Sequence, residues 1–160
     1  KDIYKGFTSM HEIFLLSMLI GGLSEFIRIN GGLDYIAKKI QGVTKVIAKY
    51  NRQVADQFGI AALVFASNLC IANNTVAIIV SGPIAKKLAQ DGDVSAKRSA
   101  SLLDIFACVV QGILPYGAQA LLLGATFGLS PWEVSTSAYY CFILAITAIV
   151  VICFRSNKKA

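Results

Sequence analysis

The sequence predicts an all-α polytopic membrane protein. Of its 160 residues, 56% are hydrophobic and 15% are charged, and the mean hydropathy is +0.64. This composition is far more apolar than that of an ordinary soluble domain. The apolar residues fall into long runs that short polar or basic segments separate. We expect one unit over residues 1–160, built in order from a transmembrane helix, a surface helix, a re-entrant helical hairpin, a proline-broken transmembrane helix and a final transmembrane helix.

Residues 8–29 form the first predicted span, because their apolar run is long enough for ~30 Å of hydrocarbon. Near its end, Glu25 precedes Arg28 by three residues, a spacing at which opposite charges pair on a helix surface. Alternatively, Glu25 faces a cavity and titrates, which makes it a candidate for proton coupling. The chain begins with Lys1 and shows no signal-peptide pattern, so we expect a longer protein whose missing part lies upstream.

Residues 33–52 are predicted to form a basic amphipathic helix. Apolar residues recur at spacings of three and four, and polar and basic residues occupy the opposite face. The apolar positions are Leu33, Ile36, Ile40, Val43 and Ile47. We expect this helix to lie on the membrane surface. A helix that packs on a partner domain is the alternative.

Residues 57–90 carry the strongest functional signal. Asn73, Asn74 and Thr75 interrupt this apolar run at its centre. Polar side chains inside a membrane are costly unless they bind something or line a cavity. The run either crosses the membrane once, or enters as a short helix, turns at these residues and leaves on the same side.

The basic residues favour the re-entrant hairpin. In that arrangement every Lys and Arg except Lys1 and Lys5 lies on one side of the membrane. A single crossing would divide the same charges between the two sides. Basic loops concentrate in the cytoplasm, so we expect the basic loops and the C-terminal tail to face the cytoplasm.

The tip of such a hairpin offers two kinds of ligand. The first helix ends in free carbonyl groups and the second begins with free amides. Carbonyl ends suit a cation, and amide ends suit an anion. We therefore expect Asn73, Asn74 and Thr75 to bind the transported ion or substrate, with sodium as the candidate metal at these residues.

Residues 100–129 are predicted to be a broken transmembrane helix. Pro115 removes an amide and clashes with the preceding turn, and Gly117 lets the chain unwind. Gln111 and Gln119 flank the break and are candidate neutral ion ligands, or else structural glutamines beside a plain kink. Asp104 shares a helix face with Gln111 and Pro115. It is a candidate for proton coupling, although a carboxylate that only stabilises the helix start is equally consistent with its position.

Residues 136–154 form the last predicted span, which contains no charge. Trp132, Tyr139 and Tyr140 match an interfacial aromatic belt near its start. The four cysteines are widely spaced in apolar segments, which favours a role as small hydrophobic residues. No aromatic-interleaved basic surface is visible, so we expect the lipid bilayer as a partner and no nucleic acid.

Two motifs carry a resemblance to a known family. They read ANNTVAIIVSGPIAKKLA from Ala72 and SLLDIFACVVQGILPYGAQ from Ser101. With the order of elements around them, they resemble the carboxy-terminal half of the NhaC-type sodium/proton antiporter family of the ion transporter superfamily. The likeness extends over nearly the whole chain, and its most specific parts are residues 72–75 and 104–119.

This resemblance implies a secondary antiporter of the bacterial inner membrane with two inverted repeats, of which this chain is the second. Asn73, Asn74 and Thr75 would form this half of a midplane site together with the break at Pro115, Gly117 and Gln119. Sodium ions and protons would be the transported ions, and no cofactor is expected. The N-terminal repeat would be a partner within the same protein, and a separated half is expected to form a homodimer or to behave poorly in detergent.

The function hypotheses differ in what the site binds. In sodium/proton antiport, a carboxylate such as Asp104 or Glu25 gains a proton as sodium leaves. In the alternative, a sodium- and proton-coupled exchanger of dicarboxylates or lactate-like organic acids, the hairpin amides hold a carboxylate beside sodium. The chain is not expected to be an enzyme, because HExxH, GxSxG and paired intramembrane aspartates are missing from its sequence.

Overall fold

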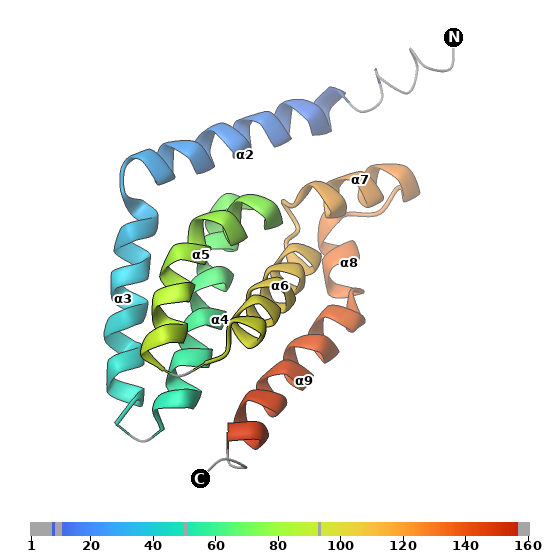
Figure 1. The fold of residues 1–160 in the computed structure, drawn as a ribbon. Helices are drawn as coiled ribbons and strands as arrows, with labels where there is room; N and C mark the ends of the chain where they lie inside the picture. The colour runs from blue at the N-terminus through green and yellow to red at the C-terminus, as the bar shows by residue number, and fades with distance from the viewer. Residues whose placement is uncertain (1–7, 9–10, 50, 93, 157–160) are drawn as a thin grey trace.

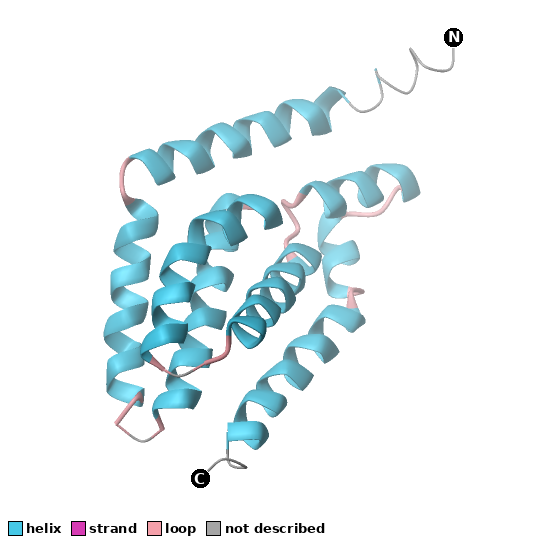
Figure 2. Ribbon diagram, in the orientation of Figure 1, coloured by secondary structure: helices cyan, strands magenta, loops and turns pink. Residues whose placement is uncertain are grey.

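The computed structural model describes residues 8, 11–49, 51–92 and 94–156. The described residues form helices joined by short turns, with no β-strand among them, and this confirms the all-α prediction (Figure 1, Figure 2). The helices are α2 (His11–Ile29), α3 (Gly32–Ile47), α4 (Arg52–Ile71), α5 (Asn74–Asp91), α6 (Ala96–Ile113), α7 (Ala118–Phe127), α8 (Pro131–Thr136) and α9 (Tyr139–Ser156).

Helix α4 is the centre of the fold. It packs against α3, α5, α6 and α9, which surround it in Figure 1. Ile60 and Val64 of α4 are fully buried, and they share one core with Ala85 of α5, Phe106 of α6 and Ile152 of α9. Because α4 has neighbours on several sides, most of its apolar side chains contact protein.

Helices α4 and α5 form an antiparallel hairpin over residues 52–91, slightly longer than the predicted 57–90 (Figure 1). Asn51 begins α4, because its side chain accepts a hydrogen bond from the Val54 amide at 3.2 Å. After Ile71, Ala72 turns the chain with a left-handed φ of 52°. Asn73 then begins α5, so the reversal occupies only Ala72 and Asn73. Whether this hairpin enters a membrane from one side stays a prediction.

Helix α3 is shorter than the predicted surface helix of residues 33–52. It ends at Ile47, and Arg52 belongs to α4. Helix α3 stands beside the hairpin in Figure 1, with Ile36 and Ile40 packed against buried residues of the hairpin. Its apolar side therefore packs mainly on α4, as in the alternative of a helix packed against protein, and its place on a membrane surface stays a prediction. The sequence showed the apolar face, but not which surface would cover it.

The predicted broken helix consists of two helices. Helix α6 ends at Ile113, residues 114–117 form a turn, and α7 begins at Ala118. A side chain at Gly117 would approach the Leu114 carbonyl oxygen to 3.2 Å, so the turn suits glycine. The last span also begins later than the predicted residue 136, because α8 occupies residues 131–136 and α9 starts at Tyr139.

Two helical stretches among the described residues are long and apolar enough to cross a membrane. They are Arg52–Ile71 and Ala96–Phe127, the second of which contains the turn at 114–117. Tyr139–Phe154 is a shorter apolar helix, and α2 carries charged residues near both ends. Large exposed apolar side chains cover much of α2 and α9, including Phe14, Leu19, Phe26, Tyr140, Ile143 and Phe154. An exterior of this kind is typical of a membrane or partner surface. The full polytopic arrangement stays a prediction.

Candidate functional site

The tip of the α4–α5 hairpin lies against α6 and against the turn that follows it. The Asn74 Nδ2 atom donates to Cys108 Sγ of α6 at 3.5 Å. From the turn, the Tyr116 hydroxyl donates to the Leu69 carbonyl oxygen in the last turn of α4, at 2.6 Å. The structure thus brings together the two motifs that the sequence singled out.

Asn73 has a structural role at this tip. Its side-chain oxygen accepts a hydrogen bond from the Val76 amide at 3.1 Å, and its extended backbone conformation is that of a helix N-cap. The bond satisfies one of the amides that a helix start otherwise leaves without a partner. Thr75, in the first turn of α5, is exposed.

Asn74 presents a free acceptor. Its Oδ1 atom is buried and accepts no hydrogen bond among the described residues, while its Nδ2 atom is used by Cys108. Leaving such an oxygen without a partner costs about 1–3 kcal/mol. A buried polar atom of this kind needs an explanation, and a bound ion or water is one.

Asn68 repeats this arrangement one helical turn before the tip. The side chain is fully buried, and its Nδ2 atom donates to the Ala107 carbonyl oxygen of α6 at 2.8 Å. Its Oδ1 atom is also buried with no hydrogen-bond partner among the described residues. Asn68 and Asn74 therefore both fix their amide nitrogen on α6 and keep a carbonyl-type oxygen unused.

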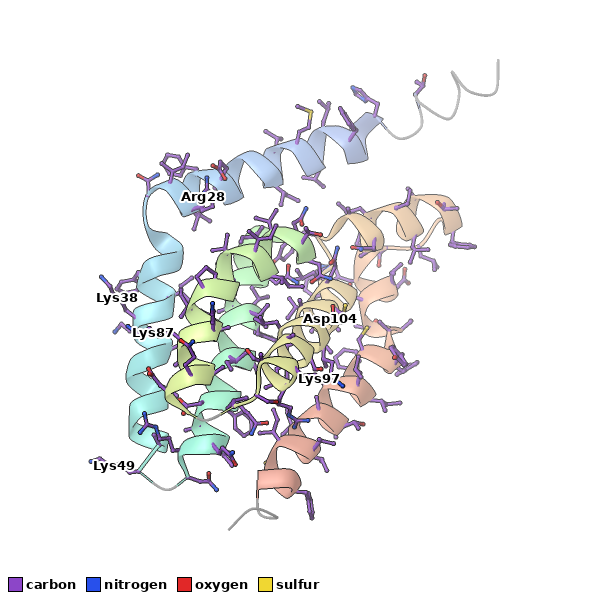
Figure 3. The ribbon with its side chains drawn as sticks, in the orientation of Figure 1. Arg28, Lys38, Lys49, Lys87, Lys97 and Asp104 are labelled. Carbon is purple, nitrogen blue, oxygen red and sulfur yellow. The ribbon has the colours of Figure 1, made fainter. Side chains whose placement is uncertain are left out.

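Asp104 connects to this group through a cysteine. Cys108 lies one turn after Asp104 on α6, and its sulfur is 3.9 Å from the Asp104 Oδ1 atom. The contacts thus run from the carboxylate through Cys108 to Asn74. Asp104 itself, labelled on α6 in Figure 3, is exposed.

Gln111 and Gln119 bind each other across the helix break. The Gln111 Nε2 atom donates to Gln119 Oε1 at 2.9 Å, which ties the end of α6 to the first turn of α7. Pro115 lies half-buried in the turn between them, and Gly117 is buried directly before α7. This bond agrees with the structural role that the sequence left open for the glutamines, and their role as ion ligands stays a prediction.

Glu25 is not part of this group of contacts. It pairs with Arg28 on the exposed surface of α2, where Arg28 Nε lies 2.8 Å from Glu25 Oε2. Figure 3 places Arg28 at the α3 end of α2, well apart from Asp104 in the view. The geometry matches the surface ion pair that the spacing of these residues indicated.

The sequence analysis missed Asn68 and Tyr116 as site residues. Asn68 interrupts the same apolar run as the tip, and Tyr116 follows the helix-breaking proline directly. A polar side chain inside an apolar run, or directly after a helix-breaking proline, was the sequence feature that could have identified them. Their partners lie 39 and 47 residues away in the sequence, and no local pattern indicates such pairings.

The donor set suits a hard cation. The described residues contain no cluster of three or more His, Cys, Asp or Glu side chains placed to hold a metal. The unused groups at the tip are instead amide oxygens, close to the carbonyl end of α4. Neutral oxygens at an interrupted helix can hold an alkali cation.

Comparison with known proteins adds no assignment: no protein-family model matches the chain, and no curated protein or solved structure matches it.

Proposed function

We propose that this chain is one half of a secondary transporter that exchanges sodium for protons across the bacterial inner membrane. The observation that carries the proposal is the junction of the hairpin tip with the broken helix. There, the Asn74 side chain keeps its Oδ1 atom free, and its Nδ2 atom contacts Cys108, which in turn contacts Asp104. A neutral cation ligand and a titratable group are the two parts that such an exchanger needs.

In this mechanism, sodium and a proton alternate at one site. Sodium binds the amide oxygens of Asn68 and Asn74 and the carbonyl end of α4, and the charged carboxylate of Asp104 favours it electrostatically. When Asp104 takes up a proton, that attraction is lost and sodium leaves. The exchange keeps the local charge nearly constant, which avoids the cost of an uncompensated charge inside a membrane.

The basic residues support a cytoplasmic location for one end of the hairpin. Lys49 precedes α4, Lys87 lies near the end of α5, and Lys97 lies in the first turn of α6. Because α4 and α5 are antiparallel, Lys49 and Lys87 share the end of the hairpin opposite its tip, and the short connection from α5 to the start of α6 lies at the same end (Figure 1). Concentrated basic charge is typical of the cytoplasmic side.

The proposal is tested by sodium-driven proton flux in vesicles that contain the full-length protein. We expect Asn74→Ala to reduce the flux by about tenfold or more, because it removes a cation ligand. Asn30→Ala is the matched control: this asparagine bonds only its own helix in the described structure, through the Phe26 carbonyl oxygen at 2.7 Å. Its flux should equal that of the wild type.

Two results would count against the proposal. Equal flux in Asn74→Ala and in the control would remove the hairpin tip from the ion path. Absence of sodium-driven proton flux in the wild type, together with sodium-dependent uptake of a dicarboxylate or lactate, would instead indicate the organic-acid exchanger.

A further inference from the structure

A second polar site lies at the end of the hairpin opposite the tip. An open cavity of about 490 Å³ lies there between the end of α3, the start of α4 and the end of α5. Five charged side chains of the described residues line it: Lys49, Arg52, Asp56, Lys87 and Asp91. None of these residues takes part in the ion site proposed above.

Asp56 is the buried anchor of this cavity. Only 5% of the residue is exposed, and its Oδ2 atom accepts no hydrogen bond among the described residues. Among the described side chains, Arg52 Nε is the cation recorded beside it, at 4.0 Å, which is beyond hydrogen-bond distance. A Cβ atom at position 92 would overlap the Asp56 carboxylate, so Gly92 provides the room for this side chain. A buried carboxylate with an unused oxygen is costly unless it receives a cationic donor.

Two lysines line the same cavity as this carboxylate but form no salt bridge with it. Lys49 and Lys87 are exposed, and neither forms a salt bridge within the described part of the chain. Figure 3 shows Lys49 at the connection between α3 and α4, and Lys87 on α5. Asp91, one turn after Lys87, likewise has no salt bridge within the described residues. The cavity therefore offers unpaired charges of both signs.

We propose that this cavity binds a phosphate joined to a primary amine, the chemistry of an aminophospholipid headgroup. Lys49, Arg52 and Lys87 bind the phosphate oxygens, as lysine and arginine do elsewhere. Asp56 and Asp91 accept hydrogen bonds from the ammonium group. A ligand with only one of these charges would leave the opposite set of side chains unused. The inference does not depend on which ion the protein transports.

The same chemistry occurs in a lipid and in free phosphoethanolamine. Dissociation constants are measured for the detergent-purified full-length protein with short-chain phosphatidylethanolamine, phosphatidylglycerol and phosphatidylcholine, and with phosphoethanolamine. We expect phosphatidylethanolamine to bind about tenfold more tightly than phosphatidylglycerol, which has no amine, and more tightly than phosphatidylcholine, whose quaternary amine donates no hydrogen bond. Tighter binding of the lipid than of phosphoethanolamine assigns the site to the bilayer, and the reverse assigns it to the soluble compound.

Two variants separate the halves of the site. Lys87→Gln should weaken the binding of phosphatidylethanolamine and of phosphatidylglycerol alike, by about tenfold, because it removes a phosphate contact. Asp91→Asn should remove the preference for phosphatidylethanolamine and leave phosphatidylglycerol unchanged. Both residues are exposed, so the fold tolerates these changes, and Lys86→Gln, beside the cavity but outside its lining, is the matched control. Equal affinity of the wild type for the lipids, or variants indistinguishable from Lys86→Gln, would overturn the proposal.

Discussion

Asn73 and Asn74 are adjacent in the sequence but serve different parts of the structure. Asn73 uses its side-chain oxygen within its own helix, where it accepts the Val76 amide. Asn74 points its amide nitrogen to Cys108 on α6 and keeps its buried oxygen free. The first is a helix cap, and the second is the stronger candidate ligand.

This difference predicts separable effects at the two positions. Asn73→Ala should lower the free energy of unfolding by about 1 kcal/mol, because it removes the N-cap of α5, while Asn73→Ser should keep most of that stability. Thermal unfolding of the purified protein measures the effect. Sodium-driven flux should survive in Asn73→Ser, and its loss there would make Asn73 a ligand as well as a cap.

At the scale of single elements, α8 shows how a short helix is held in place between two longer ones. Ser130 accepts a hydrogen bond from the Glu133 amide at 3.2 Å, and the Glu133 carboxylate accepts one from the Ser130 amide at 2.7 Å. This capping box satisfies two amides that would otherwise lack partners. Pro131 occupies the first turn, where its missing amide costs nothing.

The capping box gives a pH-dependent prediction. Hydrogen bonds from the Ser130 backbone amide, and then from its side chain, hold the pKa of Glu133 below its usual value. A lowered pKa in the folded state means that the stabilisation is present above the ordinary glutamate pKa and is lost as the pH falls through the lowered value. Wild-type protein should therefore be more stable than Glu133→Gln at neutral pH and equal to it in acid. Thermal unfolding of both proteins across acidic pH checks this, and a constant difference would contradict it.

At the scale of the whole molecule, polar and apolar surfaces are distributed in an unusual way for a protein in water. Large apolar side chains are exposed along α2 and α9, while Asn68, Asp56 and Ser81 are buried. Two helical stretches of the described residues are also long and apolar enough to span a bilayer. A lipid environment would cover the exposed apolar side chains and leave the polar groups for internal sites.

The re-entrant hairpin makes a topological prediction for the whole molecule. Single cysteines replace Lys38, Lys97 or Trp132 in a protein whose four native cysteines are alanine, and intact cells are treated with a membrane-impermeant thiol reagent. We expect labelling at position 132 alone, because the basic positions face the cytoplasm. Labelling of position 38 or 97, but not both, would mean that the hairpin crosses the membrane.

Local sequence patterns were sufficient for much of the architecture. Three features affect only the backbone within a few residues of their own positions. They are the asparagines at the tip, the proline and glycine near residue 115, and the apolar periodicity of residues 33–47. Helix ends and breaks respond to such short-range effects. The hairpin, the turn at 114–117 and the amphipathic helix could therefore be placed within a few residues of their positions in the structure.

Only the tertiary structure decided which groups are left without partners. The bonds from Asn74 to Cys108 and from Tyr116 to Leu69 join residues 34 and 47 positions apart, and packing around α4 sets them. The same packing put α3 against the hairpin and formed the charged cavity around Asp56. The sequence by itself determined where the hairpin reverses and where residues 100–129 break, because those events depend on local backbone chemistry. Which polar atoms stay free to bind a ligand depends on contacts between distant helices, and these exist only once the chain is folded.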